Sequence, residues 1–260
     1  MVRHFRPCYM SWVLTVNRFL IRLALCAWLS CLSSLGCSDP VSSAGAPAPP
    51  SSTPGCRAPA GVSDAPRTID ETVALINALP KPLSLPCFLE SLARPLQVHA
   101  SYSVFSAQPA QGARSPRIFL FQDPTVMSIV PEGEGASLLE FGEQRPEFRS
   151  LKAEIVFPVA AALDPSAPFD KLMFDSQITT CGGCHAGELQ ESEISGVRRF
   201  VSRALRPQPG DRVSVQSLDH ELAICDRSLE PQRCAILDGL LGWGSVTERD
   251  FPVGMATFGG

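Results

Sequence analysis

Apolar and polar residues alternate along the middle of the chain, between residues 96 and 157. A period of two is typical of strands that bury one face, and Gly, Pro, Ser and acidic residues separate the segments as turns do. The pattern predicts a small antiparallel sheet, either one half of a sandwich or an open barrel. The expected strands are LQVHASYSVF (96–105), RIFLF (117–121), VMSIV (126–130), SLLEF (137–141) and LKAEIVF (151–157).

Helical spacing of apolar residues occurs on both sides of this region. Thr68 and Glu71 form a capping-box pattern, and apolar residues follow at helical intervals from Ile69 to Ile76, so a short helix is expected before Pro80. The expected fold class is α+β, with the small antiparallel β region followed by a helical region. The apolar positions that predict the later helices are Val197, Phe200, Val201, Ala204, Leu205, Leu218, Leu222, Cys234, Leu237 and Leu241.

The N-terminus has the features of an export signal. Residues 1–22 carry four arginines and no acid, and residues 23–36 are a short apolar stretch, too short to span a bilayer comfortably as a helix. The tetrapeptide from Ser34 to Cys37 resembles a bacterial lipobox, with Ser where that motif usually has Leu. The resemblance implies a lipidated Cys37 and a tether in the periplasm or at the outer membrane. An uncleaved anchor or a plain signal peptide would also export the chain.

Composition then divides the chain into four parts. A segment with seven prolines, many Ser, Ala and Gly residues and few charges follows Cys37, which is typical of an extended spacer. The rest of the chain is apolar enough to bury a core, because the whole sequence is 45 % apolar and 18 % charged. The expected parts are a signal peptide (1–36), a spacer (37–66), a helix with the β region (67–165) and a helical region (166–260).

Net charge excludes one class of partner. Beyond residue 36 the chain has 18 basic and 26 acidic residues. A nucleic-acid-binding protein needs a basic surface that displaces counterions from phosphates. We therefore expect no nucleic-acid partner.

The sequence Cys181-Gly-Gly-Cys184-His185 is a C-x-x-C-H motif, the attachment site of c-type haem. Two intervening residues place both sulfurs beside the vinyl groups, and the next residue directs an imidazole toward the iron. On these residues and the export signal the chain resembles the c-type cytochromes, over about residues 170–260. The resemblance implies haem c bonded to both cysteines, with His185 as the proximal iron ligand, in a cytochrome-like helical region.

Two other readings use the same residues. A thioredoxin-like dithiol would need a βαβ unit around the C-x-x-C, and the flanking pattern lacks one. A zinc site would need a fourth ligand, such as Cys225, Cys234 or His220. In an oxidising compartment, Cys225 and Cys234 are expected to form a disulfide rather than bind zinc.

Four cysteines remain outside the signal, the lipidation site and the motif. An exported chain is expected to join them in disulfides. They allow three connectivities, and the one with the shortest sequence separations joins Cys56 to Cys87 and Cys225 to Cys234. The second pair would link two helices across a short loop.

The sixth iron ligand has several candidates. Met255 lies in an uncharged, Gly-containing segment that resembles the Met-ligand loop of cytochromes, although Ala256 follows it where that loop usually has Pro. An open position at the iron is a further alternative, and His99 is expected to face solvent. The other candidates are Met173, Met127, His220 and His99. The residues that could pair with haem propionates are Arg198, Arg199, Arg203 and Arg206, expected around a helix.

These observations favour an exported, lipid-anchored monohaem c-type cytochrome that transfers single electrons at the bacterial cell envelope. Its partners would be redox proteins of the envelope and, through the lipid, the membrane. An electron carrier is favoured over a catalyst, because no residue of the sequence marks the distal acid–base group that a haem enzyme needs. The alternative is an envelope lipoprotein whose β region binds a ligand or partner, with haem serving sensing or structure.

Overall fold

The structure is a computed structural model that describes residues 56–103, 108–175 and 177–258. The predicted signal peptide, Cys37 and most of the expected spacer lie outside these residues. The described helices are α1 (Ile69–Ala78), α2 (Leu85–Glu90), α3 (Ala167–Asp170), α4 (Val215–Ala223) and α5 (Pro231–Leu241). None of these helices is long and apolar enough to cross a membrane.

The described strands form one mixed sheet in the spatial order β6-β7-β5-β4-β3-β2-β1-β8, and β9 pairs with β1. The pairing of β1 with β9 is parallel, and the other pairs are antiparallel. The strands are β1 (Leu96–Ser101), β2 (Arg117–Gln122), β3 (Thr125–Ile129), β4 (Leu138–Arg145), β5 (Arg149–Val156), β6 (Leu189–Ile194), β7 (Val197–Arg203), β8 (Arg212–Val213) and β9 (Val246–Glu248).

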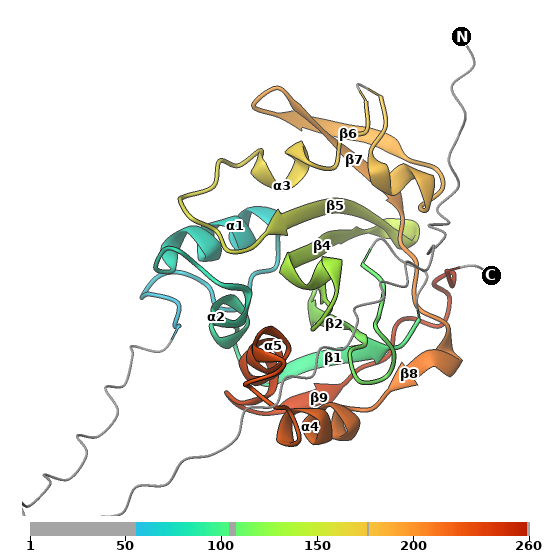
Figure 1. Ribbon diagram of the computed structural model, residues 1–260. Helices are drawn as coiled ribbons and strands as arrows, with labels where there is room; N and C mark the ends of the chain where they lie inside the picture. Colours follow the sequence, from blue (N-terminus) through green and yellow to red (C-terminus); the bar gives the residue numbers. More distant parts are fainter. Residues whose placement is uncertain (1–55, 104–107, 176, 259–260) are drawn as a thin grey trace, which may run out of the picture. The chain divides into compact units, whose positions relative to one another are not determined.

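The period of two along the strands gives the sheet two different faces. On one face, alternate residues such as Leu120, Leu139 and Ile155 are buried in a core that also contains Phe88 of α2 and Ile236 of α5. Figure 1 shows α1, α2 and α5 gathered on this side of the sheet. The other face carries the intervening residues, many of them polar, and it is the face on which the site is built.

The first helix begins where the capping pattern predicts. The Thr68 side chain accepts a hydrogen bond from the backbone N–H of Glu71, at 3.0 Å. Satisfying this free N–H stabilises the first turn. The segment before it, which composition assigns to the spacer, is held against the folded part by the Cys56–Cys87 disulfide and by a 2.8 Å hydrogen bond from the Cys56 N–H to Glu90.

The expected helical region after the sheet is not what the structure has, and the α+β prediction of a small β region followed by a helical haem-binding region is wrong. Residues 189–203 form the hairpin β6–β7 instead of a helix, and β7 pairs with β5 in the same sheet. Ser195 and Gly196 both have positive φ, as a two-residue hairpin turn requires. This Ser-Gly pair between two alternating segments is the signal that helical spacing obscured.

The helices that end the chain are linked covalently and by a buried charge. Cys225, just after α4, is bonded to Cys234 of α5, the second pair that local pairing predicts. Arg233 beside it is almost fully buried, at 1 % exposure, and forms ion pairs with Glu221 and Glu230. It also donates to the backbone oxygen of Arg114, at 2.9 Å. The guanidinium therefore joins α4 and α5 to the loop before β2.

We expect Arg233→Met to lower the free energy of unfolding by about 3 kcal/mol, because it leaves the half-buried carboxylate of Glu221 without its main partner. The measurement is urea unfolding of the oxidised protein. Arg227→Met is the control: its side chain is 63 % exposed and pairs with Asp238 at 3.5 Å, so its loss should cost less than about 0.5 kcal/mol. Equal effects of the two substitutions would contradict a structural role for the buried network.

Candidate functional site

The C-x-x-C-H motif begins on a 3-10 turn, Thr180–Gly183, between α3 and β6. Cys184 caps this turn and His185 follows it, and the backbone N–H groups of both donate to the Cys181 oxygen. Glu188 holds the start of this turn, since its carboxylate accepts hydrogen bonds from the N–H and the hydroxyl of Thr179, at 2.7 and 2.5 Å. A Cβ at Gly182 would lie 2.9 Å from the same carboxylate, so glycine there leaves room for the contact. Because Thr179 precedes the motif and Glu188 follows it, this contact joins the two ends of the motif.

His185 is held as a metal ligand would be. Its Nδ1 lies 2.8 Å from the backbone oxygen of Arg203 at the end of β7. Since a carbonyl oxygen only accepts, Nδ1 carries the proton and Nε2 keeps its lone pair. Burial, with the positive charge of Lys152 adding to it, lowers the pKa of His185 to about 4. The imidazole is thus neutral at physiological pH.

Neither motif cysteine is in a disulfide, whereas the other four cysteines of the described chain are. Burial raises the pKa of the Cys181 thiol to about 11. A redox-active C-x-x-C has the opposite property, a lowered pKa that populates the thiolate. The geometry therefore does not favour the dithiol interpretation.

The motif is not arranged as a zinc site either. A tetrahedral site brings its ligand atoms to one point. Among the described residues, the one cluster of three ligand atoms within 4.8 Å of each other is Cys225, Glu230 and Cys234, and its two sulfurs are bonded to each other. The sulfurs of Cys181 and Cys184 and the His185 ring do not converge in this way. Attachment to the rim of a macrocycle with iron at its centre requires such a spread.

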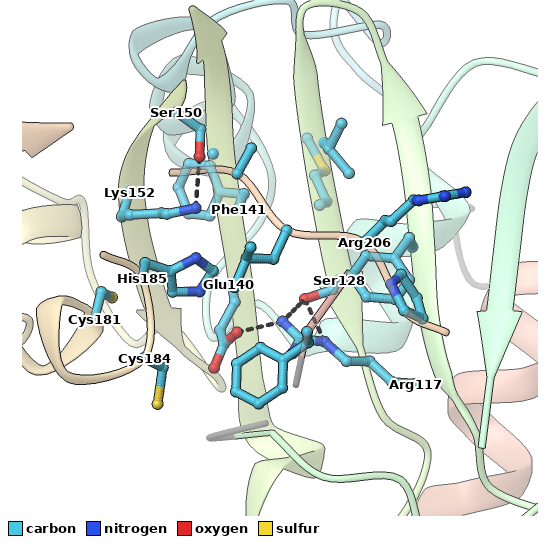
Figure 2. A pocket seen from close by; sticks show the side chains of 18 of the residues that line it. Arg117, Ser128, Glu140, Phe141, Ser150, Lys152, Cys181, Cys184, His185 and Arg206 are labelled. Atoms are coloured by element: carbon cyan, nitrogen blue, oxygen red, sulfur yellow. Dashed lines mark hydrogen bonds and ion pairs between the residues drawn. The ribbon is translucent and has the colours of Figure 1, made fainter. Parts of the chain in front are cut away.

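The motif opens onto a cavity of about 190 Å³ on the second face of the sheet (Figure 2). Strands β1 to β5 form its floor, and the motif forms one wall. Residues 204–207 and the C-terminal segment 251–258 also line it. Hydrogen bonds between Arg206 and Ala256 and between Phe258 and Arg206, at 2.9 and 3.0 Å, hold these last two segments together.

Of the candidates for the sixth ligand, Met255 and Met127 contribute to the lining of this cavity with His185, and Met173, His220 and His99 do not. Met127 is paired with Leu120 and Phe141, so its side chain lies in the core on the other face of the sheet. Met255 is buried in an apolar cluster with Phe121, Ala204 and Phe251. Its backbone oxygen accepts a hydrogen bond from Arg206 Nε, at 2.9 Å. The structure thus brings His185 and Met255 to one cavity from positions 70 residues apart in the sequence.

His99 is buried, at 7 % exposure, and the expectation that it faces solvent is wrong. Its ring packs edge-on against Phe251 of the C-terminal segment, with centroids 5.2 Å apart. That segment covers the strand face that local alternation leaves open. Because His99 and Phe251 are far apart in the sequence, the local pattern does not predict their contact.

The four arginines expected around a helix lie on or just after β7 instead. Arg206 lines the cavity, and the other three do not. Arg199 stacks on Phe169 of α3, with its guanidinium carbon 5.7 Å from the ring centroid. The helix prediction therefore misplaced most of the group.

A polar inner wall is the part of the site that sequence reasoning missed. On it, Arg117 pairs with Glu140 at 2.5 Å and donates to Ser128 at 2.8 Å, and Lys152 donates to Ser150 at 2.5 Å. These residues occupy the alternate strand positions opposite the core. Polar residues at alternate strand positions normally indicate a face in contact with solvent. Here the motif, residues 204–207 and segment 251–258 cover that face and make it a cavity wall.

The residues present fit a covalently attached haem in their chemistry. Two thiols outside disulfides and a neutral imidazole with a free Nε2 are the donors that attachment and proximal ligation need. The cavity is smaller than the roughly 300–1,000 Å³ of typical cofactor sites. A porphyrin therefore needs more space than the cavity has in this structure.

No family model, curated protein or solved structure matches this chain. The site must therefore be interpreted from its own residues.

We expect Cys181 to alkylate slowly in protein prepared without haem. At pH 8 a thiol with a pKa of about 11 is ionised about 100-fold less than one with a pKa of 9.0, and only the thiolate reacts. Cys184→Ala leaves Cys181 as the one free thiol of the described chain, and its reaction with iodoacetamide can be followed by mass spectrometry. The same protein in urea should react about 100-fold faster. Equal rates in the folded and unfolded protein would contradict the burial of this thiol.

Proposed function

We propose that the protein is an exported, lipid-anchored monohaem c-type cytochrome that transfers single electrons at the cell envelope. The observation that carries the proposal is the arrangement of the motif. Cys181 lies on a 3-10 turn that Cys184 caps, and neither cysteine is in a disulfide. The imidazole that follows has its Nδ1 occupied by a backbone carbonyl and its Nε2 available to a metal.

Electron transfer, rather than catalysis, is supported by Met255. A thioether on the same cavity as His185 offers a second axial ligand, and His/Met ligation is typical of cytochromes c and raises their potential. If His185 and Met255 both held the iron, no position would be left on it for a substrate. Haem supplies the one-electron chemistry when bound, and the chain supplies attachment, axial donors and burial.

Export is supported by two independent features. The leader is acid-free and basic, with a lipobox-like Cys37 behind its apolar stretch. The disulfides Cys56–Cys87 and Cys225–Cys234 are typical of an oxidising compartment. Covalent attachment of haem c occurs in the same compartment, so location and cofactor agree.

The first test is covalent haem. Protein matured in a bacterial periplasm should keep a haem stain on a denaturing gel and show a pyridine haemochrome spectrum, because thioether bonds survive unfolding and axial bonds do not. Cys181→Ala with Cys184→Ala should abolish the stain. Alanine in place of both Cys225 and Cys234 should keep it. A wild-type protein without stain would sink the proposal.

The second test concerns Met255. The oxidised protein should show the weak near-infrared band of sulfur-to-iron ligation, and Met255→Ala should remove it and let the reduced iron bind carbon monoxide. Met173→Ala, which changes a methionine outside the cavity, should leave both properties unchanged. A band that persists in Met255→Ala would exclude Met255 as the ligand and leave the covalent haem proposal standing.

A further inference from the structure

Lys152 is a cation in the cavity wall without an acidic partner. It projects from β5 beside His185 (Figure 2), and its ammonium donates one hydrogen bond, to Ser150. The ion pairs of the described chain all use arginine or histidine as the cation. Removing a charge from water without a counter-charge is costly. An anion in the cavity would offset that cost.

A second unsatisfied donor lies beside it. Ser202 of β7 is directly opposite Ser150 of β5, so the two side chains are on the same face of the sheet. Ser202 is fully buried, and its hydroxyl has no hydrogen-bond partner in the described part of the chain. Lys152 and Ser150 line the cavity, and Ser202 lies behind them without lining it. The Ser150 hydroxyl accepts from Lys152, so its own proton is left to donate to a further acceptor.

The neighbouring strand leaves space in front of these donors. Gly142 of β4 is paired with Lys152 and lines the cavity without a side chain. A Cβ at this position would lie 3.5 Å from the Ser150 hydroxyl. Glycine here keeps open the volume that an acceptor group would occupy.

Among the described residues no carboxylate forms an ion pair with Lys152, and the charges of Glu140 and Glu188 act on it from further away. Arg117 uses Glu140, and Arg206 adds a further cation to the lining. Burial and the charge of Glu140 raise the pKa of Glu154, and the charge of Lys171 opposes this shift. Burial lowers the pKa of Lys152 to about 8, so the amine is still mostly protonated at pH 7. The wall therefore attracts an anion of small size.

We propose that Lys152, with the hydroxyl of Ser150, binds a carboxylate in this cavity. Resting on the proposed function, we assign that carboxylate to a propionate of the attached haem. The planar, two-oxygen acceptor matches an ammonium beside a hydroxyl donor. Lys152 then takes the role that the sequence assigned to the arginines after the motif.

The experiment compares Lys152→Met with Lys171→Met in protein carrying haem. Lys171 is exposed and outside the cavity, so it controls for loss of a lysine charge. Resonance Raman spectra report the propionate bending modes, which respond to hydrogen bonding of the carboxylate. Lys152→Met should shift one of these modes, and Lys171→Met should leave both unchanged. Lys152→Arg keeps the charge and should restore a mode near its wild-type position, and Ser150→Ala should shift it less than Lys152→Met.

The outcomes separate this inference from the proposed function. If haem is attached and Lys152→Met leaves the propionate modes unchanged, the carboxylate assignment falls and the cytochrome proposal stands. If wild-type protein carries no haem, the haem-free protein is titrated with acetate and followed by NMR of the Lys152 side chain. Saturable acetate binding that is lost in Lys152→Met would support the carboxylate site with a free ligand. Its absence would overturn the site as well.

Discussion

The pairing of β7 with β5 is the constraint on which the site depends. The register sets Arg203 opposite Arg149 and Ser202 opposite Ser150. The first of these places the Arg203 carbonyl, which orients His185, and the second places a buried hydroxyl behind Lys152 and Ser150. The pairing therefore adds to the contacts of Thr179 with Glu188 that hold the motif turn. A short ladder of backbone hydrogen bonds therefore positions both the imidazole of the motif and the part of the wall that carries Lys152.

One face of the sheet contributes mainly to the stability of the fold, and the other carries the residues of the candidate site. One face is buried under α1, α2 and α5 in a continuous apolar core, which supplies the main driving force for folding. The other face keeps its polar residues and is closed by segments from the end of the chain. Burial of Arg117 and Glu140 on this face is offset by the ion pair between them, which gives each charged group a partner. The unpaired groups on the same face are then the ones that suggest a ligand.

The chemistry of the motif is consistent from one residue to the next. A buried thiol with a raised pKa is a poor redox dithiol, and a neutral imidazole with one nitrogen occupied is a good metal ligand. The sulfurs and the ring do not converge as a zinc site would require. Attachment of a macrocycle uses all of these properties together. The fold around the motif is nevertheless a sheet. The residues of the motif thus fit haem attachment, whereas the fold differs from the helical one that the resemblance implies.

Local sequence determined the features that depend on near neighbours. The Thr68 cap, the alternation of the first five strands, the C-x-x-C-H spacing and the disulfide pairs of short separation could all be inferred from it, because each depends on contacts within a few turns or on simple pairing. Tertiary structure decided the rest. The strand β7 was mistaken for a helix because its apolar residues fit both periods until β5 supplies backbone partners. His99 is buried and Lys152 is enclosed because the C-terminal segment and the motif turn cover this face of the sheet. These contacts join residues far apart in the sequence, so a local pattern does not predict them.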